Sequence, residues 1–227
     1  MSVRPRAQAL LLDLDGTLLD TAPDMAGALN RLRLLEGAPA LPFATIRPQV
    51  SHGAAALVRL GFGSRDAAEF EALRLRFLAL YRERLHAGTQ LFPGWEAVLA
   101  ALESAGIPWG IVTNKPGWLT APLLEALALD GRAGCVVAGD TLPTRKPHPE
   151  PLLHAARLLG RMPAECVYAG DAERDIIAGR AAGMHTVAVR YGYLASDEDP
   201  AAWQPDGIVA EPAELLAWLA PGAGAAA

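Results

Sequence analysis

The sequence contains few cysteines and few aromatic side chains. Among its 227 residues there are 2 cysteines, and aromatic residues make up 6%. Cys135 and Cys166 form no Cys-x-x-Cys pair, and each begins an apolar run. This placement is typical of buried thiols rather than of a metal site or a disulfide. We therefore expect two free core thiols in a protein that stays in a reducing cytoplasm.

Long apolar runs and clusters of positive charge are also missing. No stretch approaches the roughly 20 apolar residues that span a bilayer. The apolar segment near the N-terminus is short and ends at Asp13, unlike that of a signal peptide. The formal charge is -5, and no basic run exceeds a few residues. Neither nucleic acid nor a membrane is therefore an expected partner, whereas a small diffusing substrate is.

Apolar residues are abundant, at 52% of the chain, which allows a substantial core. Several runs are apolar on both faces, as in strands of a parallel sheet covered by helices. They are 7–12, 109–112, 135–138, 166–169, 185–189 and 207–209. Helical patterns follow at 94–105, 118–128, 150–159, 175–182 and 212–219, and a tail expected to be frayed lies at 221–227. The alternation predicts an α/β fold with a Rossmann-like, doubly wound parallel sheet.

The segment after the first strand interrupts this alternation. Within 66–86, large apolar side chains recur at spacings of three and four, which is typical of a helix. They are Phe70, Leu73, Phe77, Leu80 and Tyr81. About 70 residues are too many for a loop. We therefore expect a helical cap of residues 21–88, inserted in a catalytic core of 1–20 and 89–227; the alternative is that these helices only extend the core.

Two carboxylates lie at the end of the first strand, in Leu10-Leu-Leu-Asp13-Leu-Asp15-Gly-Thr17. Residues i and i+2 of an extended segment share a face, so Asp13 and Asp15 project together. Clustered carboxylates raise each other's pKa unless a cation offsets their charge, and hard oxygen ligands suit Mg²⁺. The pattern predicts a metal-assisted phosphoryl site.

Polar residues follow other predicted strands as well, and the carboxyl ends of parallel strands meet at one crevice. Thr113 and Asn114 can donate hydrogen bonds to a phosphoryl oxygen. Lys146 lies in a loop that prolines stiffen. The chain has 20 lysines and arginines, and its two lysines, Lys115 and Lys146, both lie beside the expected site. An ammonium and a guanidinium are not interchangeable there, so chemistry can explain Lys146, whereas the placement of Lys115 stays open.

A fourth motif, Gly170-Asp171 with Asp175, follows the three formed by Asp13 and Asp15, by Thr113 and Asn114, and by Lys146. Together, and in this order, the four motifs resemble those of the haloacid dehalogenase-like phosphatases over roughly residues 7–219. The resemblance implies that Asp13 is the nucleophile and that Asp15 is the general acid and then the general base. It also implies that Lys146 ties the nucleophile to the phosphoryl oxygens.

The same resemblance implies a Mg²⁺ ion held by Asp13, Asp171 and the backbone carbonyl of Asp15. Asp175 would support this ion through its waters or orient the lysine. Ala172 departs from the family, whose members usually carry Ser, Thr or Asp after the aspartate. The phosphate-binding residues implied by the resemblance are Thr17, Thr113, Asn114, His52 and Gly53.

Other activities on this core differ in residues that the sequence reveals. A phosphonate-cleaving relative needs a cap lysine, and no lysine precedes Lys115. Hydrolytic dehalogenases lack the second aspartate, which here is Asp15. The histidines lack zinc-site spacing. A phosphosugar mutase and a non-enzymatic scaffold stay open as alternatives, although every catalytic group of the family is present.

Two branches of the family resemble this chain. Val50-Ser51-His52-Gly53 and Arg190-Tyr-Gly-Tyr193 are similar to phosphoglycolate phosphatases, whereas Trp109-Gly-Ile-Val-Thr-Asn-Lys-Pro116 is more similar to bacterial phosphatases of N-acetylmuramic acid 6-phosphate, which serve cell-wall recycling. We expect the sugar phosphate as substrate, with 2-phosphoglycolate as the alternative. His52 and Arg47 are the cap residues to test for contact with the alcohol, and the favoured interpretation of Arg47 is a solvated helix charge. A monomer or homodimer is the default assembly.

Overall fold

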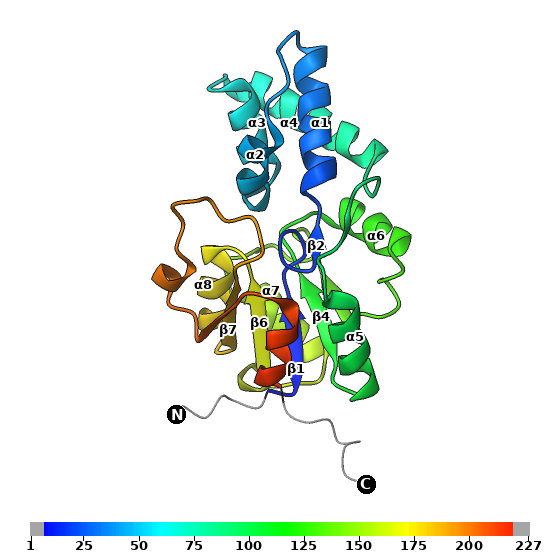
Figure 1. The fold of residues 1–227 in the computed structure, drawn as a ribbon, viewed down its shortest axis with the longest axis vertical. Helices are drawn as coiled ribbons and strands as arrows, with labels where there is room; N and C mark the ends of the chain where they lie inside the picture. The colour runs from blue at the N-terminus through cyan, green and yellow to red at the C-terminus, as the bar shows by residue number, and fades with distance from the viewer. Residues whose placement is uncertain (1–6, 220–227) are drawn as a thin grey trace.

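The structure, a computed structural model, describes residues 7–219. Six parallel strands form one sheet in the order β5-β4-β1-β6-β7-β8 (Figure 1). They are β1 (Ala9–Leu12), β4 (Trp109–Val112), β5 (Cys135–Val137), β6 (Cys166–Gly170), β7 (His185–Val189) and β8 (Gly207–Val209). The predicted α/β class and doubly wound sheet are confirmed. The tail predicted to be frayed, 221–227, lies outside the described residues.

Helices cover both faces of this sheet. They are α5 (Trp95–Ser104), α6 (Gly117–Ala126), α7 (Glu150–Leu158) and α8 (Glu173–Ala181). Side chains of β1 alternate between the faces: Leu10 and Leu12 pack in the same cluster as α5, and Leu11 packs with residues of α7 and α8. The strand is fully buried, as its apolar sequence predicts.

Three short 3₁₀ helices flank the later strands, namely η2 (Pro163–Glu165), η3 (Pro200–Trp203) and η4 (Pro212–Trp218). The last replaces the closing α-helix predicted at 212–219. It begins at a proline and packs against α5. None of the helices within 7–219 combines the length and the apolar character needed to cross a bilayer.

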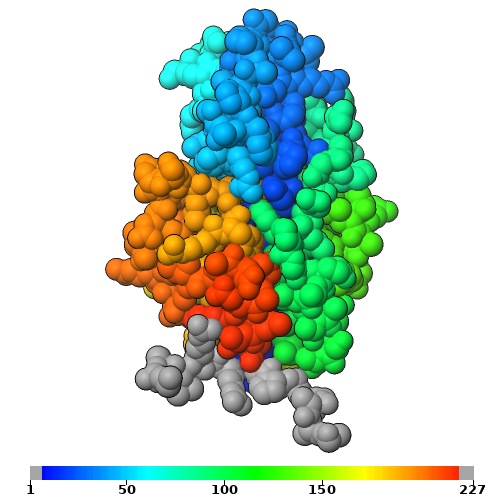
Figure 2. All heavy atoms as spheres, in the orientation of Figure 1, coloured from blue at the N-terminus to red at the C-terminus, as the bar shows by residue number. Residues whose placement is uncertain are grey.

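The inserted segment folds as helices that pack on one another beyond the sheet. They are α1 (Ala22–Leu35), α2 (Phe43–Ile46), η1 (Arg47–His52), α3 (Gly53–Phe62) and α4 (Ala67–Glu83). Helix α4 contacts both α1 and α3, and the segment forms a lobe above the sheet (Figure 2). In α4, Leu73, Phe77 and Tyr81 are buried, as their spacing predicts. The division into a cap of 21–88 and a core of 1–20 and 89–227 stays a prediction.

Two short strands connect this lobe to the sheet. Strand β2 (Leu19–Asp20) leaves for α1, and β3 (Gln90–Leu91) returns to α5. They pair antiparallel, with Leu19 opposite Leu91 (Figure 1). The sequence did not reveal them, because two residues carry no periodicity. The two connections between the inserted segment and the rest of the chain, β2 and β3, therefore lie side by side.

Candidate active site

Strand ends bring the predicted residues together. Asp13 follows β1, Thr113 follows β4 and Asp171 follows β6, and β1 lies between β4 and β6 in the sheet. The Asp13 N–H donates to the Ala169 carbonyl at 2.9 Å, which extends the ladder to the carboxylate itself. The three side chains therefore have fixed starting points at one edge of the sheet.

Lys146 forms the most buried charged contact of the site. Its Nζ lies 2.9 Å from Asp13 Oδ1 and 2.8 Å from Asp175 Oδ1. It also donates to the Val112 carbonyl at 2.8 Å and to the Tyr168 hydroxyl at 2.6 Å. Because the ammonium is enclosed by these acceptors, its position is fixed beside Asp13.

Three buried carboxylates lie close enough to share a metal ion. Oxygens of Asp13, Asp171 and Asp175 are all within 4.8 Å of one another. Burial raises the pKa of Asp171 to about 7, and the charges of Asp13 and Asp175 add to the rise. Burial also raises the pKa of Asp13, although Lys146 opposes the rise. Like charges in a buried site need a cation to offset them.

One oxygen of this cluster has no partner within the described chain. Asp171 Oδ1 is buried and accepts no hydrogen bond. The other oxygen, Oδ2, accepts from the Tyr193 N–H at 3.0 Å and from the Ser51 hydroxyl at 2.5 Å. An unsatisfied carboxylate oxygen beside two further carboxylates fits a divalent cation with oxygen ligands.

Gly16 allows the chain to pass close to this cluster. Its φ is +86°, and a Cβ there would lie 2.1 Å from Asp171 Oδ2. A side chain would therefore collide with a candidate metal ligand as well as strain the backbone.

The Asp15 carboxylate contacts different partners. Its Oδ1 accepts from the Thr21 hydroxyl at 2.6 Å and from Lys115 Nζ at 2.8 Å. The third carboxylate of the cluster that could hold a metal ion is therefore that of Asp175, and the Asp15 side chain does not belong to this cluster. Both oxygens of Asp175 are already engaged, Oδ1 by Lys146 and Oδ2 by the N–H of Ala172 at 3.1 Å.

The predicted phosphate-binding residues divide into two groups. Thr113, Asn114, His52 and Gly53 line one cavity of about 840 Å³ together with Asp13, Asp15 and Lys146. Thr17 does not line it: this residue is fully buried, and its carbonyl accepts from Trp95 Nε1 at 2.7 Å. Asn114 donates one amide N–H to the Lys146 carbonyl at 2.9 Å, so it also fixes the lysine loop.

Residues of the inserted segment reach the cavity from α1, η1, α3 and α4. Arg74 of α4 forms a two-pronged pair with Glu71, at 2.7 and 2.6 Å. Arg47, for which the sequence favoured a solvated charge over a substrate contact, does not line the cavity. Its guanidinium lies over the Tyr193 ring at 4.7 Å, and its Nη1 donates to the Gly192 carbonyl at 3.2 Å. Arg47 therefore joins the cap to the loop after β7.

Sequence reasoning missed other residues of the cavity wall. Arg174 lines it with Nη2 3.8 Å from Asp13 Oδ2, and Tyr81 lines it from α4. Neither carries a signal in the sequence, because an arginine in a first helical turn and an aromatic in an apolar stripe have ordinary structural roles. The rarity of lysine was the one hint that pointed to Lys115.

Comparisons with known proteins identify the family and relatives of this chain. Residues 10–189 match the family model described as haloacid dehalogenase-like hydrolase. A phosphoglycolate phosphatase of Xanthomonas campestris is 48% identical over 94% of this chain and 98% of its own. An N-acetylmuramic acid 6-phosphate phosphatase of Pseudomonas aeruginosa is 43% identical over 94% of this chain and 95% of its own.

A crystal structure described as a predicted phosphoglycolate phosphatase of Haemophilus somnus has the same fold. It is 28% identical, with a TM-score of 0.83 over 92% of this chain and 96% of its own.

Proposed function

The chain belongs to the haloacid dehalogenase-like hydrolases and is a phosphoric monoester hydrolase, and we propose that its reaction proceeds through a phosphorylated Asp13. The observation that supports this proposal is the buried contact of Lys146 with two carboxylates. The ammonium lies 2.9 Å from Asp13 and 2.8 Å from Asp175. It therefore holds the nucleophile where a phosphoryl group would enter the cavity.

In the first half-reaction, Asp13 attacks phosphorus and a carboxylate oxygen forms a bond to it. The bond between phosphorus and the alcohol oxygen breaks, and Asp15 gives its proton to that oxygen. The alcohol leaves, and the phosphoryl group remains on Asp13. Lys146, with Arg174 3.8 Å from Asp13 Oδ2, stabilises the charge of the phosphoryl oxygens.

In the second half-reaction, water attacks the phosphorus of the aspartyl-phosphate. Asp15 takes a proton from this water, and the bond between Asp13 and phosphorus breaks. Inorganic phosphate is released, and both aspartates return to their starting states. The hydroxyl of Thr113 and the free amide N–H of Asn114 orient the phosphoryl group in both halves.

Mg²⁺ is the cofactor that the acidic cluster fits, and it would offset the charge between nucleophile and phosphate when bound. Asp13, Asp171 and the backbone carbonyl of Asp15 would hold it. Asp175, whose oxygens already accept from Lys146 and Ala172, would support the site from outside.

For the alcohol, we propose N-acetylmuramic acid, with residues 21–88 acting as a cap over the cavity. The cavity measures about 840 Å³, which is in the range of sites for sugar-sized ligands. The cap's Arg74 is paired with Glu71, so the roof does not offer this cation to a small second carboxylate. His52 and Gly53 line the cavity where the alcohol would lie.

The alternative substrate is 2-phosphoglycolate. It is supported by the phosphoglycolate phosphatase of Xanthomonas campestris, which is 48% identical to this chain. This smaller alcohol carries a carboxylate, and Arg145 and Arg174 line the cavity as cations on the core side.

The test is phosphate release from both esters side by side, with Mg²⁺ and with EDTA. We expect metal-dependent turnover and a higher kcat/KM for N-acetylmuramic acid 6-phosphate. A preference for 2-phosphoglycolate would overturn the substrate and leave the reaction class standing. Metal-independent turnover would contradict the proposed cofactor.

A further inference from the structure

Lys115 connects the proposed general acid to the cap. Its side chain is 4% exposed, and its Nζ donates to Asp15 Oδ1 at 2.8 Å. The same Nζ donates to the Tyr81 hydroxyl at 2.9 Å and lies 4.6 Å from the centre of the Tyr81 ring. Tyr81 belongs to α4, whereas Lys115 lies in the core loop before α6. One ammonium therefore joins the core to the inserted helices at the catalytic carboxylate.

The Lys115 side chain stays charged because of its surroundings. Burial disfavours the charged lysine, but the neighbouring Asp15 and Tyr81 outweigh burial and raise the pKa of Lys115 above its usual range. Burial raises the pKa of Tyr81 to about 12, so its hydroxyl stays neutral. A charged donor held between a buried hydroxyl and a partly buried carboxylate has little freedom to leave.

The two oxygens of Asp15 are used differently. Oδ1 accepts from both Thr21 and Lys115. Within residues 7–219, Oδ2 accepts no hydrogen bond from another residue, and Asp15 lines the cavity. Because two donors occupy Oδ1, Oδ2 is the oxygen left to exchange a proton with the alcohol.

We propose that Lys115 is a positioning residue for Asp15 and that Tyr81 of the cap completes this positioning. This inference rests on the proposed function, because it concerns how the general acid is oriented. It gives α4 a part in leaving-group departure in addition to its part in lining the cavity.

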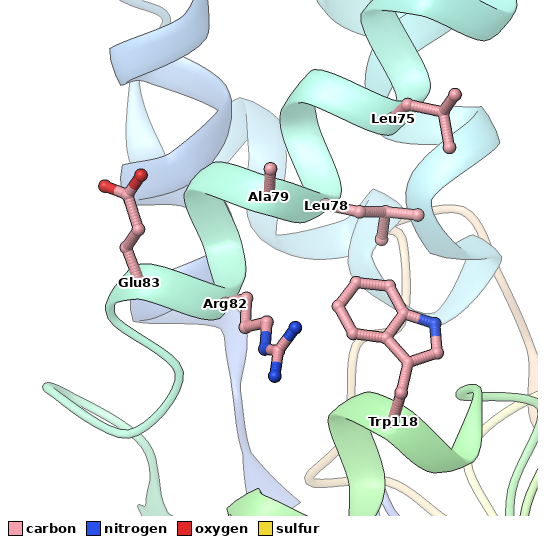
Figure 3. A pocket seen from close by; sticks show the side chains of 6 residues that line it. All are labelled: Leu75, Leu78, Ala79, Arg82, Glu83 and Trp118. Atoms are coloured by element: carbon pink, nitrogen blue, oxygen red, sulfur yellow. The ribbon is translucent and has the colours of Figure 1, made fainter.

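A second contact joins the same two regions and provides a control. The guanidinium of Arg82, the residue after Tyr81, lies 5.5 Å from the Trp118 ring of α6. Figure 3 shows both side chains in a groove of about 500 Å³ between α4 and α6. Arg82→Met removes this contact and leaves Lys115 in place. It should change activity by less than about 2-fold on any substrate, as expected for an exposed contact.

The experiment compares two leaving groups. An alkyl phosphate such as β-glycerol phosphate needs a proton on the departing alkoxide, whereas p-nitrophenolate leaves without one. We expect Lys115→Met to lower kcat/KM by about 100-fold for the alkyl ester and by less than about 10-fold for p-nitrophenyl phosphate. Tyr81→Phe keeps the ring and removes the hydroxyl. It should lower the ratio of kcat/KM for the alkyl ester to kcat/KM for p-nitrophenyl phosphate by about 3-fold to 10-fold. Near-ultraviolet and far-ultraviolet circular dichroism check that each variant is folded.

A double mutant separates positioning from direct binding. If Lys115 acts through Asp15, Lys115→Met should cost nothing further with the alkyl ester in an Asp15→Asn background. Equal losses on both esters, or a full additional loss in that background, would overturn the inference. If Lys115→Met does not fold, Tyr81→Phe decides, and an unchanged ratio would overturn the role of the cap. A wild-type enzyme that hydrolyses neither these two esters nor N-acetylmuramic acid 6-phosphate and 2-phosphoglycolate would instead refute the proposed function.

Discussion

The charged side chains on the two sides of the cavity are paired in different ways. We call the core side, with Asp13, Lys146 and Asp171, the floor, and the side formed by α4 of the inserted segment the roof. On the floor, Lys146 is 1% exposed and lies between Asp13 and Asp175. In the roof, Arg74 and Glu71 are 32% and 49% exposed and pair with each other along one helix. Charges on the floor depend on residues far apart in the chain, whereas those in the roof depend on a neighbour three positions away. The floor is therefore hard to change and the roof is easy to change.

Asp13→Asn should have the largest effect on the floor. An amide cannot form the acyl phosphate, so turnover should fall by at least about 10⁴-fold. The fold should survive, because the substitution keeps the shape and removes one of three clustered charges. Single-turnover assays and a thermal melt measure the two effects. Full activity would refute the nucleophile.

Lys146→Met should have the second largest effect, because it should lower both kcat and the free energy of unfolding. We expect a loss of about 10³-fold in kcat. Removing one partner of a buried charge pair costs about 3–5 kcal/mol, because Asp13 and Asp175 would be left unpaired. Urea unfolding measures the stability change. A variant that unfolds like the wild type would show that this floor tolerates change as the roof does.

Adding Mg²⁺ should stabilise the floor, and more so at pH 8 than at pH 5. The pKa of Asp171 in the fold, about 7, is raised above its usual value. The folded protein then binds more protons than the unfolded chain between about pH 4 and pH 7, so metal-free stability falls as pH rises through this window. Mg²⁺ offsets the ionised cluster at pH 8 but must displace a proton at pH 5. Melting temperatures with Mg²⁺ and with EDTA at both pH values measure the difference, and equal shifts would contradict it.

The smallest effect is expected in the roof. Arg74→Ala should change stability by less than about 0.5 kcal/mol, because an exposed pair contributes little. Its matched partner, Glu71→Gln, frees the Arg74 guanidinium for a substrate carboxylate. We expect Glu71→Gln to lower KM for 2-phosphoglycolate by a few-fold while leaving kcat unchanged. A fall in kcat for either variant would place this pair in the chemistry rather than in substrate choice.

The same contrast explains what the sequence could predict. The six strands were readable because β1, β4 and β6 are buried runs with no polar interruption. Asp13 and Asp171 were readable because each follows the end of a strand, where the topology brings them together, and Lys146 was readable because lysine is rare in the chain and prolines stiffen its loop. The α/β class, the family and the phosphatase activity were predicted and are confirmed.

The roof was less readable because its contacts depend on how helices pack. The sequence offered a solvated charge or a substrate contact for Arg47, yet its guanidinium lies over the Tyr193 ring. Thr17 belongs to the first motif, yet it is buried beneath Trp95 rather than at the cavity. No periodicity indicates that Tyr81 would meet Lys115, since an aromatic in an apolar stripe predicts only burial.

The paired crossings β2 and β3 have a consequence for how such enzymes diversify. The insertion leaves and returns through Leu19–Asp20 and Gln90–Leu91, which lie next to each other. A segment with adjacent ends can be lengthened, shortened or exchanged without rerouting the rest of the chain. A lineage can therefore acquire a new metabolic role by replacing this one segment, provided that the new segment supplies a partner for Lys115 where Tyr81 now stands.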